Sequence, residues 1–270
     1  MTAPALPRAS APAPLVVVYT TRDRARTLMR SAFPRRRARL LLVRTPDEVD
    51  AAFRVALVDA AIVDLASAQD ETWRAAALAR EFPSVPFYGL TGLRAAEAPL
   101  LAQCVTLDFA DVLVEGVDDA VSRELVLRHA FSTRFALALS EPPDSLALDT
   151  PLQRAAWRNI VAWAGRPVRT QLLADALGVT REHLSRTFAA DGAPNLKRVI
   201  DLVRLIAAAE LAKNPGYDVR DVAAVLDFAS SSHLSSTAQR IVGTRPASLA
   251  RLRAVDLVER FTKGHGRSRG

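Results

Sequence analysis

Apolar runs and amphipathic stretches alternate over the first half of the chain. Five short apolar runs are typical of buried strands and lie at 15–19, 40–43, 60–65, 86–90 and 112–114. Helical periodicity occupies the intervals at 23–33, from Pro46, at 72–81 and near 95–102, and a last helix is predicted from about 118 to 139. Because strand and helix alternate strictly, the sequence predicts a doubly wound α/β domain with a parallel five-stranded sheet and helices on both faces.

The second half of the chain has helical periodicity only. A linker is predicted at 140–150, where Pro142 and Pro143 oppose helix formation and stiffen the chain. The next helix is predicted to begin at Pro151, because proline is favoured at the first helical position. The predicted organisation is a disordered tail at 1–12, the α/β domain at 13–139, the linker, an all-α domain at 151–262 and a basic tail at 263–270.

One small unit occurs twice in the all-α region, at 170–192 and at 218–246. Each copy has a short apolar-periodic helix, a tight turn and a second helix with one apolar stripe and one small or polar face. That arrangement is a helix-turn-helix motif, whose second helix can enter the major groove of DNA. A long amphipathic run at 195–213 joins the copies and would hold the two reading helices at a fixed separation.

Several anchor residues fall at a spacing known from one family. They are Thr180, Leu184, Arg186, Phe188 and Asp191-Gly192 in the first copy, Arg204, Ala208 and Leu211 in the joining helix, and Val222-Ala223, Asp227-Phe228, Gly243 and Pro246 in the second copy. On these residues the region resembles the DNA-binding domain of the AraC/XylS family of transcription regulators. Asp227 stands where the family has a turn glycine, and Leu234 and Ala238 replace aromatic core positions. The second reading helix is therefore expected to be the weaker one.

The first reading helix is predicted from an N-cap at Thr180 to about Ala190, with Leu184 and Phe188 facing the core. The opposite face supplies the candidates for base-edge contact, which are Arg181, Glu182 and Ser185. Arginine can bond guanine bidentately, glutamate can accept from cytosine, and serine is permissive. From the resemblance, Arg186 is expected to contact phosphate or its own domain.

The second reading helix is rich in serine, which carries little base specificity. Contacts to the DNA backbone and recognition of DNA shape are expected there. The candidate residues are Ser231, Ser232, Ser235, Ser236, Gln239 and Arg240. The helix starts at Val219 and Pro246 are further candidates for holding phosphate. The alternative for all of these residues is an ordinary solvated helix surface.

The strand ends of the α/β domain carry Asp64, Thr91 and Glu115. Residues 13–132 resemble a receiver domain of response regulators, which has a flavodoxin-like fold; Asp64 matches the phosphate-accepting aspartate and Thr91 the switch hydroxyl. Receivers also need an acidic pair after the first strand to hold Mg²⁺, and a lysine where Glu115 stands. Thr20 and Thr21 take the place of the acidic pair.

The sequence therefore predicts a pseudo-receiver that keeps the fold and has lost the phosphoryl chemistry. A single carboxylate is a poor magnesium site, and a phosphorylated Asp64 would face Glu115 instead of a cation. Asp64 is then a vestigial position whose side chain caps a neighbouring backbone N–H. The alternative is that Asp23 donates a second carboxylate and that phosphorylation at Asp64 persists.

Charge is distributed unevenly along the chain. Residues 1–150 hold 17 Lys and Arg against 19 Asp and Glu, whereas residues 151–270 hold 19 against 10. Basic residues that neutralise phosphates release counterions and give salt-dependent affinity for DNA, so the charge supports DNA binding by the second half. The single cysteine, Cys104, favours a reducing compartment, and no apolar run reaches the ~18 residues of a membrane helix, so a cytoplasmic location is expected.

The sequence thus predicts a DNA-binding, AraC-type transcription regulator that reads a specific sequence in duplex DNA without depending on phosphorylation. The receiver resemblance implies that the front domain forms a homodimer or docks a partner, with a protein or small-molecule effector setting activity. No enzyme, metal or cofactor is expected, because no glycine-rich phosphate loop, paired-cysteine pattern or G-x-S-x-G motif occurs. Two alternatives stay open: a response regulator gated by phosphorylation of Asp64, and a protein-interaction adaptor with degenerate DNA binding.

Overall fold

The computed structural model describes residues 11–66, 68–92 and 98–266. The chain forms two compact units. The sheet unit comprises Ala13–Arg134 together with Asn214–Asp221, and the helical unit comprises Phe135–Lys213 and Val222–Gly270. Most of both predicted tails, 1–10 and 267–270, and the predicted helix start at 95–97 lie outside the described residues.

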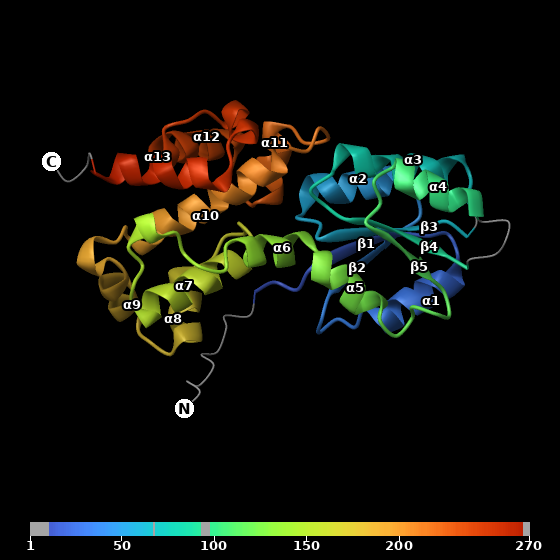
Figure 1. Ribbon diagram of the computed structural model, residues 1–270, viewed down its shortest axis with the longest axis horizontal. Coiled ribbons are helices and arrows are strands. Elements are labelled where there is room, and N and C mark those ends of the chain that lie inside the picture. Colours follow the sequence, from blue (N-terminus) through green and yellow to red (C-terminus); the bar gives the residue numbers. More distant parts are fainter. Residues whose placement is uncertain (1–10, 67, 93–97, 267–270) are drawn as a thin grey trace. The chain divides into compact units, whose positions relative to one another are not determined.

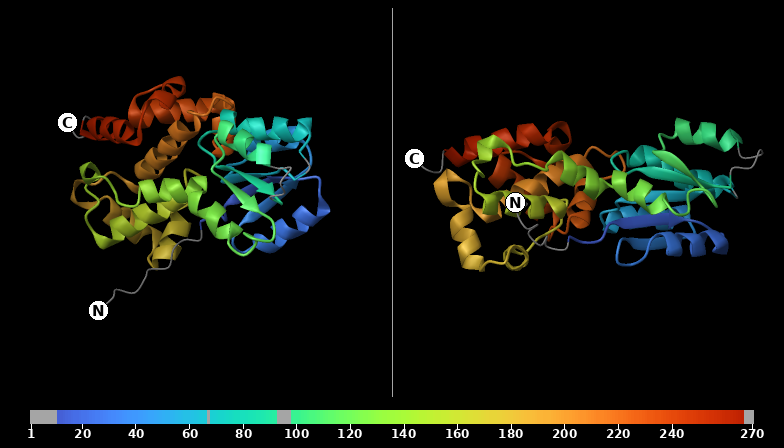
Figure 2. Two further views of the ribbon diagram at one scale, coloured as in Figure 1. Left: turned by 45° about the vertical axis from the view of Figure 1, so that its right-hand side comes forward. Right: turned by 60° about the horizontal axis from the view of Figure 1, so that its bottom comes forward.

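The sheet unit is a doubly wound α/β domain, as the sequence predicted. Its strands run parallel in the order β2-β1-β3-β4-β5. They are β1 (Leu15–Tyr19), β2 (Arg39–Val43), β3 (Ala60–Asp64), β4 (Phe87–Thr91) and β5 (Asp111–Val114). The helices are α1 (Asp23–Ala32), α2 (Pro46–Val55), α3 (Asp70–Glu81), α4 (Ala98–Thr106) and α5 (Ser122–His129). In Figures 1 and 2, α1 and α5 lie on one face of the sheet and α2, α3 and α4 on the other.

The central strands β1, β3 and β4 are buried at every position, which explains why they read as continuous apolar runs, whereas the edge strands β2 and β5 are partly exposed. On one face, Val16, Val18 and Ile62 pack against Met29 of α1 and Val126 of α5, all at most 1% exposed. The opposite face is aromatic. There Phe53 of α2 stacks on Phe82 at a ring-centroid distance of 4.3 Å and on Phe87 of β4 at 5.7 Å.

The single helix predicted from about 118 to 139 is wrong, because two helices occupy this segment. They are α5 and α6 (Phe131–Ala138), separated by Ala130 in an extended conformation with ψ 145°. The reason is Asp59, a buried residue 72 positions before Phe131. The Phe131 N–H donates to the Asp59 carbonyl at 2.9 Å, and the Ser132 N–H donates to the Asp59 carboxylate at 3.0 Å. These bonds replace those that a continuous helix would make.

The predicted linker at 140–150 is a folded part of the helical unit. It contains a 3-10 helix, η2 (Asp144–Leu146), that contacts the last helix of the chain, α13 (Ala254–Gly266). Leu146 and Leu148 are 1% and 2% exposed, so the segment contributes to a core. The boundary between the two units falls inside α6, between Arg134 and Phe135.

The helical unit is organised around one buried helix, α10 (Leu196–Leu211). It contacts α7, α12, α13 and η4, and nearly every one of its side chains is buried. The other elements are α7 (Pro151–Ala162), α8 (Thr170–Leu177), α9 (Arg181–Phe188), η3 (Ala190–Gly192), α11 (Val219–Val225), α12 (Ser231–Val242), η4 (Pro246–Arg251) and α13 (Ala254–Gly266). None of the described helices combines the length and the apolar character that crossing a bilayer requires.

Candidate functional site

The first helix-turn-helix copy consists of α8, a turn and α9. Gly178 ends α8 with a φ of +67°, in the left-handed region that glycine adopts most readily. Thr180 then caps α9, because its side chain accepts from the His183 N–H at 3.1 Å. The predicted N-cap is therefore confirmed.

The outer face of α9 is the first candidate contact surface. Leu184 and Phe188 are 0% exposed and fix the helix to the core, as predicted from their spacing. The predicted base-edge and phosphate candidates, Arg181, Glu182, Ser185 and Arg186, are all exposed. The Arg181 guanidinium lies 3.3 Å from the Glu182 carboxylate, and the two side chains are 58% and 75% exposed. An exposed pair of this kind is weak, so a DNA base or phosphate can compete for either partner.

The turn of the second copy depends on Arg204 of α10. Its guanidinium donates to the carbonyl oxygens of Leu226 and Asp227 at 3.1 and 3.2 Å and lies 3.9 Å from the centre of the Phe228 ring. Burial lowers the pKa of Arg204. Asp227, which replaces the family's turn glycine, adopts a φ of +55°. Aspartate is among the residues that tolerate this conformation best, so the turn keeps its shape without glycine.

The outer face of α12 differs from that of α9. Ser232, Ser236, Gln239 and Arg240 are exposed, whereas Ser231 and Ser235 are half-buried. Two of the hydroxyls donate within the helix, Ser235 to the Ser231 carbonyl at 2.9 Å and Ser236 to the His233 carbonyl at 3.1 Å. Arg240 also pairs with the Asp201 carboxylate of α10 at 2.8 Å.

The two helix starts expected to hold phosphate do not have suitable geometry. At the start of α11, the Asp218 carboxylate accepts from the Arg220 N–H at 2.6 Å and from the Asp221 N–H at 2.8 Å. These amides are therefore occupied by an anion of the chain itself. Pro246 begins a 3-10 helix of six residues, which has too few aligned peptide groups to make an anion site.

The strand-end residues of the sheet unit meet at a second candidate site. Asp64 is 2% exposed and accepts from the Thr20 hydroxyl at 2.5 Å. It also binds the Arg22 guanidinium with both oxygens, at 2.8 Å from Nε and 2.6 Å from Nη2. Glu115 binds the same guanidinium. The Asp64 carboxylate accepts from the Ala66 N–H at 3.2 Å, which confirms the predicted backbone cap.

Arg22 is the residue of this site that sequence reasoning missed. Burial would lower the pKa of Arg22, but its hydrogen bonds to Asp64 and Glu115 outweigh burial and raise it above the ordinary value. The only sequence signal was a basic residue directly after Thr20 and Thr21 at the end of β1. Asp23 does not supply a second carboxylate here, because its side chain is 89% exposed and pairs with Arg44 at 3.4 Å.

The residues present do not fit the magnesium ion of a receiver. Mg²⁺ needs near-octahedral oxygen ligation, usually with one or two carboxylates and several waters. Here the Asp64 carboxylate is bound by a guanidinium and a hydroxyl, so a second cation would meet the charge of Arg22. Among the described residues, no group of three or more His, Cys, Asp or Glu side chains is arranged to hold a metal.

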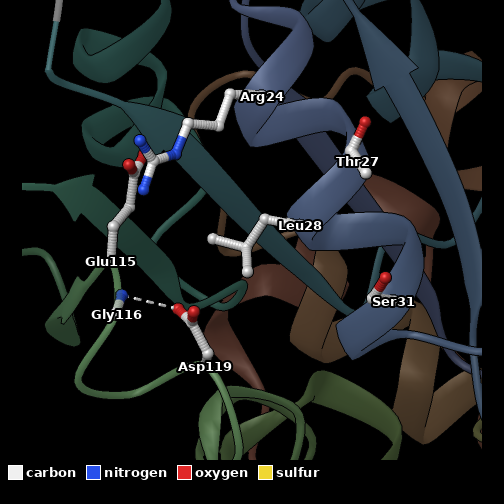
Figure 3. Close-up of a pocket in the computed structure, with 7 residues that line it drawn as sticks. All are labelled: Arg24, Thr27, Leu28, Ser31, Glu115, Gly116 and Asp119. Atoms are coloured by element: carbon white, nitrogen blue, oxygen red, sulfur yellow. Dashed lines mark hydrogen bonds between the residues drawn. The ribbon is translucent and has the colours of Figure 1, made fainter.

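An open groove of about 430 Å³ lies beside Glu115 (Figure 3). Its lining residues are Arg24, Thr27, Leu28, Ser31, Glu115, Gly116 and Asp119. Figure 3 shows the Arg24 side chain pointing toward the Glu115 carboxylate, and the Gly116 N–H donates to Asp119 at 2.9 Å. Polar side chains therefore line the groove from α1 and from the segment after β5, and Leu28 of α1 is the large apolar side chain among them.

Comparison with known proteins defines the class of the helical unit. Residues 173–251 match a family model described as a helix-turn-helix domain, which confirms the AraC-type DNA-binding region inferred from the anchor residues. A search of curated proteins gave no match. Among solved structures, the chain is similar to full-length FixJ from B. japonicum, at 12% identity over 71% of this chain and 95% of that chain, with a TM-score of 0.37.

Proposed function

We propose that this protein is a transcription regulator that reads a specific DNA sequence and acts without phosphorylation. The main support for this proposal comes from the outer face of α9. Two buried apolar side chains lock the helix, its N-cap is satisfied, and its exposed face presents charged and polar groups only. A reading helix needs this combination, because side chains must reach base edges from a rigid support.

The two reading helices have unequal roles in this proposal. Arg181, Glu182 and Ser185 of α9 contact base edges. On α12, two of the serine hydroxyls already bond to their own helix, and Arg240 pairs with Asp201, so α12 contributes contacts to phosphates and to DNA shape. The excess of basic residues in 151–270 supplies the sequence-independent part of the affinity.

The sheet unit is a pseudo-receiver in this proposal. The main support for this part of the proposal is the position of Arg22. Its guanidinium binds both Asp64 and Glu115, so the carboxylate that would attack a phosphoryl donor is already paired with a cation. A protein or small-molecule effector, or a second copy of the chain, then sets activity in place of phosphate. The groove beside Glu115 is a candidate effector site, because its size falls within the range of small-molecule pockets.

Selection from a randomised duplex library at two salt concentrations tests whether the protein binds a specific DNA sequence. We expect an enriched motif at both concentrations, with affinity falling as salt rises. Binding that depends strongly on salt but enriches no motif would reject sequence reading and favour the adaptor alternative.

Incubation with acetyl phosphate or beryllofluoride tests the second part of the proposal. We expect no adduct by intact-mass analysis with acetyl phosphate and no change in DNA affinity with either reagent. Asp64→Asn serves as the matched control. A change in the wild type that Asp64→Asn abolishes would establish the phosphorylation-gated alternative.

A further inference from the structure

One helix of the second helix-turn-helix copy is shared between the two compact units. The segment Asn214–Asp221 belongs to the sheet unit, whereas the chain from Val222 onward belongs to the helical unit. α11 runs from Val219 to Val225, so its first turn lies in one unit and its remainder in the other. The first turn is therefore held by residues that precede it by more than a hundred positions.

The segment enters the sheet unit through specific polar contacts. The Asn214 side chain accepts from the Ser84 N–H at 2.8 Å and donates to the Ser84 hydroxyl at 2.7 Å. The Gly216 N–H donates to the Glu81 carbonyl at 3.0 Å. Two of these three bonds use backbone groups of Glu81 and Ser84, at the end of α3 and just beyond it, so they depend on the fold of the chain as well as on side chains.

Aromatic packing completes the docking. The Tyr217 ring lies against Phe82, with centroids 4.8 Å apart, and Phe82 in turn stacks on Phe53 of the core. A Cβ added to Gly216 would lie 2.7 Å from the Phe82 ring and 3.1 Å from the Glu81 Cβ. Only glycine fits this approach, because real Cβ atoms essentially never come so close to a ring held in a core.

Arg54 of α2 binds the docked segment at two points. Its guanidinium donates to the Gly216 carbonyl at 3.2 Å and to the Asp221 carboxylate, in the first turn of α11, at 2.8 Å. Asp50, one turn earlier in α2, binds the same guanidinium at 2.8 Å and orients it. The start of α11 is thus tied to α2 by a charge-assisted contact.

We propose that the surface formed by α2 and Glu81–Ser84 is a docking site for Asn214–Asp221 and that this docking organises the second helix-turn-helix copy for DNA binding. Docking fixes the first turn of α11, and α11 fixes the turn before α12. Release of the segment leaves α11 anchored at one end only, so α12 loses part of its preorganisation. The proposal rests on the proposed DNA-binding function and adds the route by which the sheet unit regulates it.

Arg54→Ala in the full chain tests the proposal, with Arg74→Ala as the matched control because its pair with Asp47 is exposed and neither residue is among those that hold Asn214–Asp221. Hydrogen exchange over 214–225 reports docking, and affinity for the selected duplex reports function. We expect Arg54→Ala to raise exchange in this segment and to weaken duplex binding at least about fivefold, the lower end of typical coupling between sites. Arg74→Ala should do neither.

Tyr217→Phe gives a test of opposite sign that does not depend on disrupting the fold. The Tyr217 side chain is buried, and its hydroxyl has no hydrogen-bond partner among the described residues. Removing the hydroxyl keeps the ring contact and abolishes an unsatisfied buried group, so exchange over 214–225 should slow. Faster exchange in Tyr217→Phe would contradict the docking geometry.

The possible outcomes distinguish failure of the docking inference from failure of the proposed DNA-binding function. Rapid exchange over 214–225 in the wild type would overturn the docking site whatever the DNA result. Faster exchange in Arg54→Ala with unchanged affinity for a selected duplex would overturn the regulatory role. If the wild type selects no duplex, the proposed function fails and this inference fails with it, although the exchange data still report whether the segment is docked.

Discussion

Replacing Arg22 with alanine should destabilise the sheet unit, because the change leaves two carboxylates without their shared cation. Removing one partner of a buried ion pair typically costs about 3–5 kcal/mol of unfolding free energy. Asp64 is 2% exposed, but the Arg22 side chain is 25% exposed, so water can solvate part of the space left by the guanidinium. We therefore expect a smaller loss of about 2–3 kcal/mol.

Native-state hydrogen exchange measures this loss in each unit separately, which matters because a chain of two units need not unfold in one step. Peptides from β1 and β3 should lose protection in Arg22→Ala, whereas peptides from α10 should not. Arg74→Ala is the matched control. Its pair with Asp47 is exposed on both sides, so the expected loss is below about 1 kcal/mol.

A double-mutant cycle with Asp64→Asn locates the effect. The neutral amide removes the charge that Arg22 compensates, so the double mutant should lose less stability than the sum of the two single mutants, with a coupling of about 1–3 kcal/mol. Two results would refute the conclusion that Arg22 is the shared cation of Asp64 and Glu115. One is additive losses of unfolding free energy in the double mutant, and the other is a loss in Arg22→Ala no larger than that in Arg74→Ala.

Three further predictions concern the second helix-turn-helix copy. Arg204→Ala should cost about 2–4 kcal/mol of unfolding free energy in denaturant titration, because the carbonyls of Leu226 and Asp227 lose their donor and the Phe228 ring loses its contact; an unchanged midpoint would contradict this. Asp227→Gly should leave stability unchanged or raise it by up to about 1 kcal/mol, because glycine adopts the φ of +55° without steric cost, and a clear loss would give the side chain another role. Hydrogen bonds from the Asp221 and Arg220 amides lower the pKa of Asp218, so its cap should stabilise α11 fully above the unfolded pKa of about 3.9 and be lost as pH falls through the lower folded value. The difference in melting temperature between wild type and Asp218→Ala should shrink between pH 5 and pH 3, and a constant difference would exclude titration of this group.

Local sequence signals predicted most of the fold. The central strands of the sheet unit could be predicted because both of their faces are buried, which produces Val-rich runs such as 15–19. The helix-turn-helix copies were readable because their turns need particular residues, such as Gly178 with positive φ and Thr180 as N-cap. The exposed face of α9 followed from helical periodicity once Leu184 and Phe188 were assigned to the core.

The features that sequence reasoning missed all depend on partners distant in the chain. Arg22 meets Asp64 and Glu115, which lie 42 and 93 positions later, so no local pattern marks it as the cation of that site. The break at Ala130 depends on Asp59, and the docked Asn214–Asp221 segment depends on α2 and α3. Such contacts follow from topology, and side chains that meet only in the folded chain leave little periodic signal.

The most direct test of the central claim compares the duplex motifs selected by wild type, by Arg181→Ala and by Arg158→Ala. Arg158 is the matched control, because it is an exposed arginine of the helical unit that lies on α7 and pairs with Glu141. The account predicts that Arg181→Ala relaxes the motif at one base position, by about 1–3 kcal/mol, while Arg158→Ala keeps the wild-type motif. An unchanged motif in Arg181→Ala, with affinity lowered equally for all sequences, would contradict base reading by this face of α9.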